Sequence, residues 1–217
     1  MPIRVKICCI ASIEVARLAV AEGAAALGLV SEMPSGPGVI DMATIQAVAR
    51  ATPPPVATVL LTSRTDPAGL VDQVRMSAAN TVQLVDAVPD AAYAALRQAV
   101  PQVKIVQVIH VTGDQSVDEA VGLRRQVDAL LLDSGNPDLP IKELGGTGRV
   151  HDWRLSRRIV TESGLPVFLA GGLNADNVGD AIRAVDPYGI DLCSGVRTDH
   201  RLDAAKLARF MAAASAA

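Results

Sequence analysis

Aromatic residues are scarce in this chain, and their scarcity argues against a nucleic-acid partner. One Trp, two Tyr and two Phe occur among 217 residues. Proteins that hold single-stranded nucleic acid stack its bases on aromatic side chains, and proteins that hold duplexes carry an excess of Lys and Arg. The formal net charge here is −3 at pH 7. We therefore expect no nucleic acid among the partners.

The sequence also lacks long apolar runs and a leader-like start. A helix that crosses a bilayer needs about 20 predominantly apolar residues, and no uninterrupted stretch of that kind occurs. The first residues pass directly into a strand pattern, without the apolar core of a signal peptide. We expect no membrane partner and a cytoplasmic location.

Cysteine and histidine are too few and too scattered for a disulfide framework or a metal site. There are three cysteines, an odd number, and Cys8 and Cys9 are adjacent. This usage is typical of a reducing compartment. The histidines, His110, His151 and His200, lie far apart and lack the spacing of metal ligands. We expect no metal site.

Apolar residues in short runs are what the sequence has in abundance. Half of all residues are apolar. The runs alternate with stretches in which apolar residues recur every three to four positions, the period of a helix. Near-continuous apolar strands are typical of a parallel sheet covered by helices. The runs are residues 5–7, 26–30, 56–61, 81–84, 104–109, 129–133, 166–170 and 190–192.

Eight such strand–helix units favour a closed barrel over an open sheet. They predict an α/β fold, a single (β/α)8 TIM barrel that forms one domain over residues 1–217. Ser12, Asp41, Asp66 and Ser116 are residue types that cap helices, and each stands near the expected start of one. In such barrels the active site lies at the carboxyl ends of the strands.

Two glycine-rich segments follow the last two runs, at residues 169–174 and 191–196. Glycine lets a ligand approach the backbone and leaves N–H groups free to point at it. The loops after strands 7 and 8 of these barrels frequently bind phosphate. We expect a phosphorylated small-molecule ligand, with two ordinary tight turns as the alternative. The expected phosphate-binding residues are Gly171, Gly172, Asn174, Ser194 and Gly195, with Gly146 from a third glycine-rich segment, 145–148.

Cys8 and Asp133, at the ends of the first and sixth runs, are the candidates for acid–base chemistry. A thiol can act as a base, and a carboxyl whose pKa is raised by burial can act as an acid. Flanking one substrate, they would move a proton from carbon to oxygen. Each residue also has a structural alternative, because cysteine packs as a small apolar side chain and aspartate caps loops. We expect Cys9 to point to the opposite side of the strand and to serve packing.

Taken in order, these segments resemble the phosphoribosylanthranilate isomerase family over nearly the whole chain. The family reads Lys-Ile-Cys-Gly at the first strand and Gln-Leu-His-Gly at the fourth. As an ordered set the matching segments are specific. They are Lys6-Ile7-Cys8, Gln83-Leu84, Leu131-Leu132-Asp133-Ser134, Gly145-Gly146-Thr147-Gly148 with Asp152-Trp153, Ala170-Gly171-Gly172-Leu173-Asn174 with Asn177-Val178, and Asp191 with Ser194-Gly195-Val196.

The resemblance implies an Amadori rearrangement, in which an N-(5-phosphoribosyl) amine becomes a 1-amino-1-deoxyketose phosphate during tryptophan biosynthesis. In the family, the cysteine at the Cys8 position is the base that takes the proton from C2 of the sugar. The aspartate at the Asp133 position is the acid that protonates the ring oxygen. The resemblance implies no cofactor, and we expect a monomer or a homodimer.

The chain departs from the family pattern where the family binds the anthranilate carboxylate. The family has an arginine after strand 2, but residues 34–38 read Pro-Ser-Gly-Pro-Gly. Val85 and Asp86 replace the family's His-Gly, and Arg197 replaces a glutamate. Arg64 or Arg197 are the cations that could compensate. Two alternatives stay open: a sister isomerase of another phosphorylated aminosugar, and a barrel that binds a sugar phosphate without catalysis.

Overall fold

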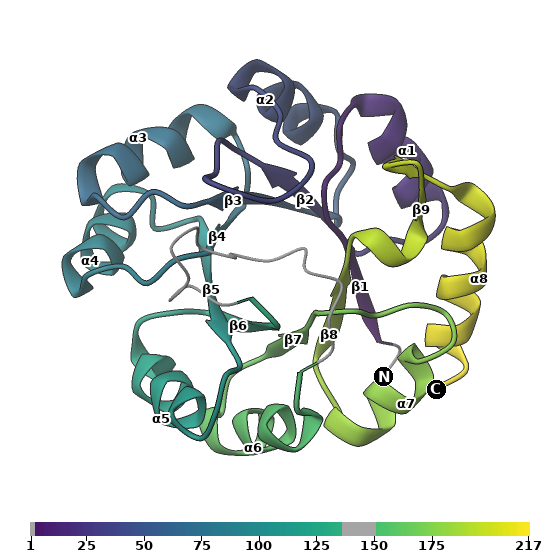
Figure 1. Ribbon diagram of the computed structural model, residues 1–217. Helices are drawn as coiled ribbons and strands as arrows, with labels where there is room; N and C mark the ends of the chain where they lie inside the picture. The colour runs from purple at the N-terminus through teal and green to yellow at the C-terminus, as the bar shows by residue number, and fades with distance from the viewer. Residues whose placement is uncertain (1–2, 136–150) are drawn as a thin grey trace.

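Eight parallel strands close into a barrel in this computed structural model, which describes residues 3–135 and 151–217 (Figure 1). The strands are β1 (Arg4–Ile7), β2 (Ala26–Val30), β3 (Ala57–Thr62), β4 (Thr81–Leu84), β5 (Lys104–His110), β6 (Ala129–Asp133), β7 (Val167–Leu169) and β8 (Gly189–Leu192). Each strand pairs with the next in sequence, and β8 closes the ring by pairing with β1. The predicted (β/α)8 barrel is confirmed, and every predicted run overlaps an observed strand.

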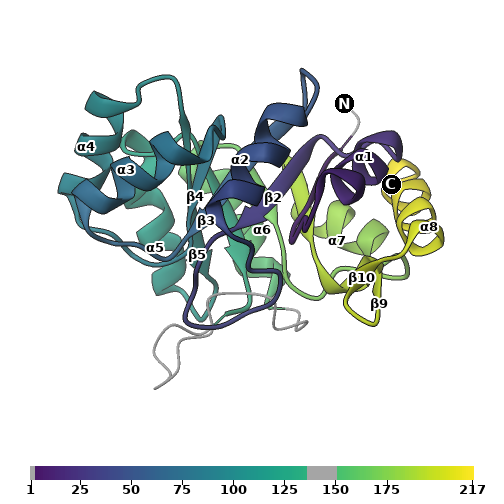
Figure 2. The same cartoon turned by 90° about the horizontal axis from the view of Figure 1, so that it is seen from above.

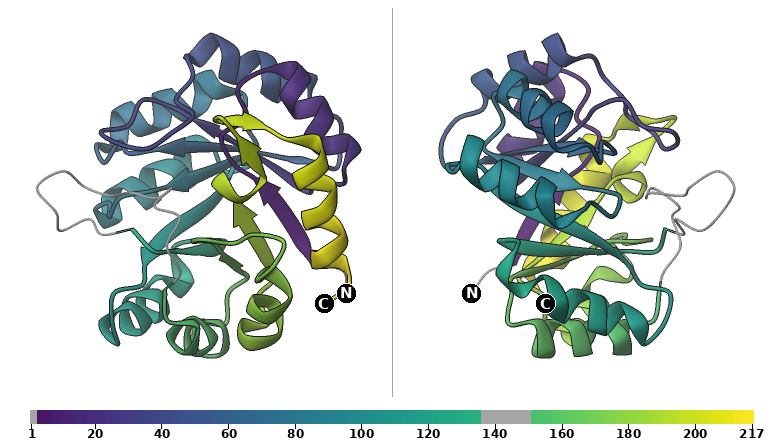
Figure 3. Two further views of the ribbon diagram at one scale, coloured as in Figure 1. Left: turned by 45° about the vertical axis from the view of Figure 1, so that its right-hand side comes forward. Right: turned by 90° about the vertical axis from the view of Figure 1, so that its left-hand side faces the viewer.

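A ring of helices encloses the barrel, as the view along its axis shows (Figure 1). The helices are α1 (Ile13–Ala21), α2 (Met42–Ala51), α3 (Pro67–Ser77), α4 (Asp90–Ala99), α5 (Gln115–Gly122), α6 (Trp153–Ser163), α7 (Val178–Val185) and α8 (Ala204–Ser215), with the 3-10 turns η1 (Leu123–Arg125) and η2 (Ser194–Val196). The end of α8 lies near the amino end of β1 (Figure 3). A short hairpin of β9 (Arg197–Thr198) and β10 (Arg201–Leu202) lies beside α8 (Figure 2). None of the helices in residues 3–135 and 151–217 combines the length and apolar character that a membrane crossing needs.

Three of the predicted helix starts are confirmed. Ser12, Asp41 and Asp66 directly precede α1, α2 and α3, and a side-chain oxygen of each accepts the backbone N–H three residues further on. Such a cap satisfies one of the N–H groups that the first turn leaves unpaired, which contributes about 1 kcal/mol.

The predicted helix start at Ser116 is wrong. The helix α5 begins one residue earlier, and Ser116 is completely enclosed. Its hydroxyl donates to the carbonyl of His110 at 3.2 Å and accepts the N–H of Thr112 at 3.2 Å. Ser116 therefore fixes the loop that leaves β5, instead of capping the helix.

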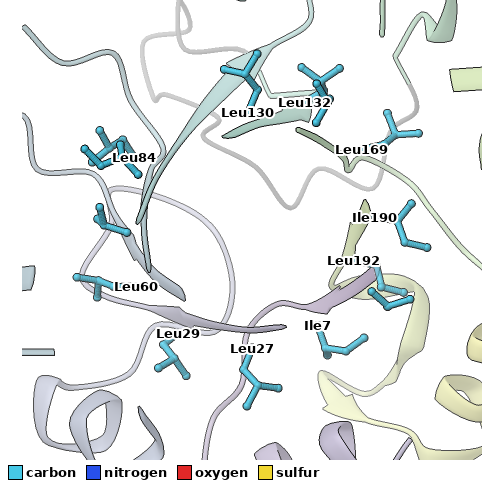
Figure 4. Packing of buried hydrophobic residues seen from close by; sticks show 14 of the residues in the cluster. Ile7, Leu27, Leu29, Leu60, Leu84, Leu130, Leu132, Leu169, Ile190 and Leu192 are labelled. Carbon is cyan, nitrogen blue, oxygen red and sulfur yellow. The ribbon is translucent and has the colours of Figure 1, made fainter. Parts of the chain in front are cut away.

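Alternate residues of the strands pack on two different sides. Large side chains such as Leu27 and Leu29 on β2 point outward and are buried under the helices (Figure 4). Each contributes about 1.5–3 kcal/mol by leaving water. Their neighbours Ala26 and Val30 belong to a second, inner cluster of smaller residues that also includes Cys8. The inner face therefore leaves space at the barrel mouth for a site.

Candidate active site

A cavity opens at the carboxyl ends of the strands. Cys8 and Asp133, which come from opposite parts of the barrel wall, both line it. Gly171 and Gly172 after β7, and Ser194 after β8, line the same cavity. The structure thus brings the predicted acid–base pair and part of the predicted phosphate site into one space.

Cys8 is the first residue after β1 and is 8% exposed. Its N–H donates to the carbonyl of Leu192 at 2.9 Å, so β8 holds its backbone in place. Gly28 on β2 leaves room for its side chain, because a Cβ there would lie 3.0 Å from Cys8 Sγ and 3.2 Å from Lys6 Nζ. A larger residue at Gly28 would push against both groups.

Asp133 ends β6 and follows Ala129 and Leu131 on the inner face of the barrel. It is 9% exposed, and its Oδ1 accepts the N–H of Ser134 at 2.7 Å. Burial raises the pKa of the Asp133 carboxyl, the Ser134 hydrogen bond lowers it, and repulsion from Asp191 raises it again. Because the net pKa is raised, this carboxyl is suited to hold a proton and deliver it.

A buried ion pair joins β1 to β8 at the inner end of the cavity. Lys6 and Asp191 are register partners, and Lys6 Nζ lies 2.9 Å from Asp191 Oδ1. Both side chains are buried, so the two opposite charges meet away from water. Burial alone would lower the pKa of Lys6, but attraction to Asp191 and Cys8 raises it to about 12. A permanent positive charge therefore stands close to Cys8.

The prediction that Cys9 points away from the site is wrong. Strand alternation ends with Ile7, the last residue of β1. Cys9 has a φ of 60°, a left-handed conformation that is uncommon outside glycine, and it lines the same cavity as Cys8. Its Sγ lies 3.8 Å from Cys8 Sγ and donates to the carbonyl of Pro37 at 3.5 Å. Sequence alternation could not reveal this, because it holds only inside a strand.

The two glycine loops lie directly against each other. A Cβ at Gly195 would lie 2.1 Å from the carbonyl oxygen of Leu173, so only glycine fits there. Gly171 and Gly172 have φ values of 85° and 63°. Among the residues that the structure describes, neither of their N–H groups has a hydrogen-bond acceptor. These N–H groups can therefore meet an anion at the cavity wall.

Asn174 mainly shapes its own loop. Its N–H donates to Asn177 Oδ1 at 2.9 Å, and its Oδ1 accepts the N–H of Asp176 at 2.8 Å. The side chain of Asn177 in turn donates to the carbonyl of Gly172 at 3.0 Å. The Asn174 Nδ2 also donates to the carbonyl of Gly172, at 3.5 Å, and Asn174 is not among the residues that line the cavity. Gly146, the remaining predicted phosphate ligand, lies outside the described residues.

Neither arginine named as a substitute cation lines the cavity. The guanidinium of Arg197 donates to the carbonyl oxygens of Cys8 at 2.6 Å, of Cys9 at 2.9 Å, and of Cys193. Arg64 lies 3.9 Å from the carboxylate of Asp66 and lines a separate groove. No Lys or Arg of ranges 3–135 and 151–217 contributes to the cavity wall.

Gln83 on β4 is a cavity residue to which the sequence assigned no role. It is 4% exposed, and its Oε1 has no hydrogen-bond partner among the described residues. A buried amide oxygen without a donor costs about 1–3 kcal/mol, so it is poised to accept a hydrogen bond from a ligand. The signal that could have found it is a polar residue at an inward position of a short apolar strand.

Comparison with known proteins gives a consistent result. The family model described as N-(5'-phosphoribosyl)anthranilate (PRA) isomerase matches residues 5–213. An isomerase of that name from Halobacterium salinarum is 40% identical over 217 residues, which cover 98% of this chain and 96% of the relative. A second from Methanosarcina mazei is 38% identical over 195 residues, 89% of this chain and 85% of the relative.

Solved structures agree with the sequence comparison. The phosphoribosylanthranilate isomerase of Thermotoga maritima has a TM-score of 0.83 and 27% identity, and covers 99% of this chain and 100% of that one. Another such isomerase has a TM-score of 0.80 and 25% identity, with 99% and 100% coverage. That protein holds reduced 1-(o-carboxyphenylamino)-1-deoxyribulose 5-phosphate.

Proposed function

Because the chain belongs to the N-(5'-phosphoribosyl)anthranilate isomerase family, we propose that it catalyses the Amadori rearrangement of phosphoribosylanthranilate in tryptophan biosynthesis. The observation that carries the proposal is the pairing of Cys8 with Asp133 across one cavity, beside two glycine loops. The aldose is converted to a ketose by moving protons within the substrate, so no external electron donor or acceptor is required.

In the proposed mechanism, Asp133 begins as the neutral acid. Its proton goes to the furanose ring oxygen, the C1–O bond breaks, and the nitrogen lone pair forms an iminium at C1. Cys8, as thiolate, then takes the proton from C2, and that electron pair forms the enolamine. Tautomerisation of the enolamine gives the ketone at C2 and a secondary amine at C1.

The surrounding charges support these roles. The Lys6 ammonium lies close to Cys8 and can attract the negative charge that the mechanism places on Cys8 Sγ. The raised pKa of Asp133 keeps its proton available at higher pH than an exposed aspartate would. Burial of both groups keeps bulk water from competing for the transferred protons.

We assign the phosphate end of the substrate to the loops after β7 and β8. Two observations support this assignment. Gly171 and Gly172 have a left-handed backbone, and their N–H groups have no acceptor within the described residues. Ser194 and Gly195 begin η2, beside them. Backbone donors of this kind favour an anion over a neutral group.

A sister isomerase is the second candidate, and the part of the cavity wall near the β2 loop favours it. The wall near the β2 loop consists of Met33, Pro37 and their neighbours, without a cation among the described residues. An aglycone without a carboxylate would fit such a wall. A non-catalytic barrel is disfavoured, since it would have no need of a buried acid facing a cysteine.

The test combines genetics with kinetics. We expect the gene to restore growth of a tryptophan auxotroph that lacks this isomerase. In purified protein, Cys8→Ala and Asp133→Asn should each lower turnover by about 10²–10⁴-fold. Asp118→Asn, an exposed carboxyl on α5, is the matched control and should keep full activity. Equal turnover in wild type and either site variant would remove that residue from the mechanism.

A further inference from the structure

All three cysteines of the chain meet at the cavity, although they are far apart in sequence. Cys193 directly follows β8, and its Sγ lies 2.9 Å from Cys9 Sγ. Cys9 Sγ is a further 3.8 Å from Cys8 Sγ. A sulfur–sulfur distance of 2.9 Å brings two thiols close enough to bond after a small adjustment, since a disulfide bond is about 2.05 Å long.

Arg197 links the two backbone segments that carry these thiols. Its guanidinium binds the carbonyl oxygens of Cys8 and Cys9 on one side and of Cys193 on the other. One rigid, five-donor group thus joins the chain that leaves β1 to the chain that leaves β8. The left-handed backbone of Cys9 then turns its side chain toward Cys193.

We propose that Cys9 and Cys193 form a reversible disulfide site at the mouth of the cavity, with Cys8 remaining a free thiol. The oxidant is a low-molecular-weight disulfide such as glutathione disulfide. Cys9 and Cys193 both line the cavity, and Cys193 is partly exposed, so one thiol of the pair is open to an oxidant from solvent. The bond would join Cys9, the residue after the proposed base, to Cys193, the residue before the loop assigned to phosphate.

The reaction proceeds by two exchanges. The Cys193 thiolate attacks one sulfur of the oxidant, whose S–S bond breaks and releases one thiolate. Cys9 then loses its proton to solvent and attacks Cys193 Sγ in the mixed disulfide, which releases the second thiolate. The protein loses two electrons and two protons, and one oxidant molecule is reduced to two thiols.

Cys193 is the attacking residue of the pair. The hydrogen bond with Cys9 and the positive charge of Arg197 lower the pKa of Cys193 despite its burial, whereas the same hydrogen bond, the one with Cys8 and burial raise the pKa of Cys9. Cys193 is also the more exposed of the two residues. Thiolate character and access are what decide which thiol reacts first.

A bond between Cys8 and Cys9 is disfavoured by their adjacent positions. Adjacent residues have Cα atoms about 3.8 Å apart, which is below the roughly 4.4–6.8 Å range of disulfides. Cys8 would have to distort its backbone to bond with Cys9, and that backbone is held by Leu192 and Arg197.

The experiment is thiol mapping of the wild-type protein after exposure to glutathione disulfide. The protein is denatured, alkylated with iodoacetamide, digested with trypsin and analysed by tandem mass spectrometry. We expect the number of alkylated thiols to fall from three to one, and the peptides 7–17 and 184–197 to be joined. Fragmentation between Cys8 and Cys9 should place the alkyl group on Cys8, and dithiothreitol should restore all three thiols. Three alkylated thiols, glutathione adducts without the link, or a link through Cys8 would overturn the proposal.

Matched variants separate the pair from the third cysteine. Cys8→Ser should still form the bond between the two peptides, at the wild-type rate. Cys193→Ser should keep two alkylatable thiols and form no link. Cys9→Ser should also form no link, but it should carry a glutathione adduct on Cys193, because the thiol that resolves the mixed disulfide is missing. Circular dichroism checks that each variant folds. If a variant does not fold, the thiol map of the wild-type protein decides whether Cys9 and Cys193 form the bond. The experiment measures peptide masses and not turnover. Failure of the disulfide proposal would therefore leave the proposed isomerase activity untouched.

Discussion

A single buried carboxyl, Asp133, illustrates how function and stability oppose each other at the residue scale. Its raised pKa means that the folded protein binds this proton more tightly than the unfolded chain does. The proton therefore stabilises the fold fully below the unfolded pKa, near 4. That stabilisation is lost as the pH rises through the folded pKa, and above it the buried negative charge costs stability.

We predict that Asp133→Asn inactivates the protein but makes it more stable at neutral pH. The amide has the shape of the acid, still accepts the Ser134 N–H, and carries no charge to bury. Thermal unfolding from pH 7 down to pH 4 should show the variant melting above wild type at pH 7, with the gain shrinking as the pH falls. A gain that grew toward acid would contradict a raised pKa at Asp133.

At the scale of elements, the junction of β1 and β8 carries most of the site. Lys6 and Asp191 pair across it, Cys8 hydrogen bonds across it, and Arg197 joins the two chains beyond it. Lys6 and Asp191 are 3% and 9% exposed, so removal of one partner leaves an uncompensated charge in the barrel.

We predict that Asp191→Asn lowers the free energy of unfolding by about 3–5 kcal/mol, because Lys6 keeps its charge without a partner. The double variant Lys6→Met with Asp191→Asn should recover much of this loss, since it buries no charge; with wild type, Lys6→Met and Asp191→Asn it completes a double-mutant cycle. Urea unfolding of the four proteins in the cycle measures both effects. If the double variant loses as much free energy of unfolding as the two single variants lose together, the two charges do not interact.

The elements themselves were largely readable from the sequence. Parallel strands buried on both faces read as apolar runs, so all eight were predicted to within about two residues. Helix starts were predicted where a side chain caps its own helix, as at Asp41, and missed at Ser116, whose hydroxyl bonds the loop that leaves β5, the strand directly before it. The residue type alone does not tell whether a serine caps a helix or fixes the loop that precedes it.

At the scale of the whole molecule, the site could be predicted only in part. The barrel fold alone places strand ends together, which is why Cys8, Asp133 and the glycine loops could be assigned to one mouth. The contact of Cys193 with Cys9 and the position of Arg197 depend on how loops pack after their strands end. Neither follows from strand alternation or from closure of the barrel.

The charge around the mouth has a consequence for substrate affinity. An anthranilate carboxylate at the β2 loop would be desolvated against Gly36, Pro37 and Met33, and Arg197 is already occupied by backbone carbonyls. Loss of one charge-assisted hydrogen bond costs about 1.5–3 kcal/mol, or roughly a ten- to hundredfold loss of binding. The loss falls on binding and not on the acid–base pair, so it should appear in KM.

We therefore predict a raised KM for phosphoribosylanthranilate, and a lower KM in the variant Pro37→Arg. Pro37 lines the cavity, and its carbonyl already accepts from Cys9, so an arginine there would begin close to the aglycone. Steady-state kinetics of wild type and variant measure the change, with kcat expected to stay within a few-fold. Pro53→Arg, an exposed proline beyond the end of α2, is the control for the added charge.

A KM of wild type at the low end of the usual range of about 1 μM to 1 mM would contradict this prediction. A cation from outside the cavity wall must then reach the carboxylate. Arg64→Ala would then be the first variant to measure, because its side chain is the one beside the β2 loop that is held only by an exposed aspartate.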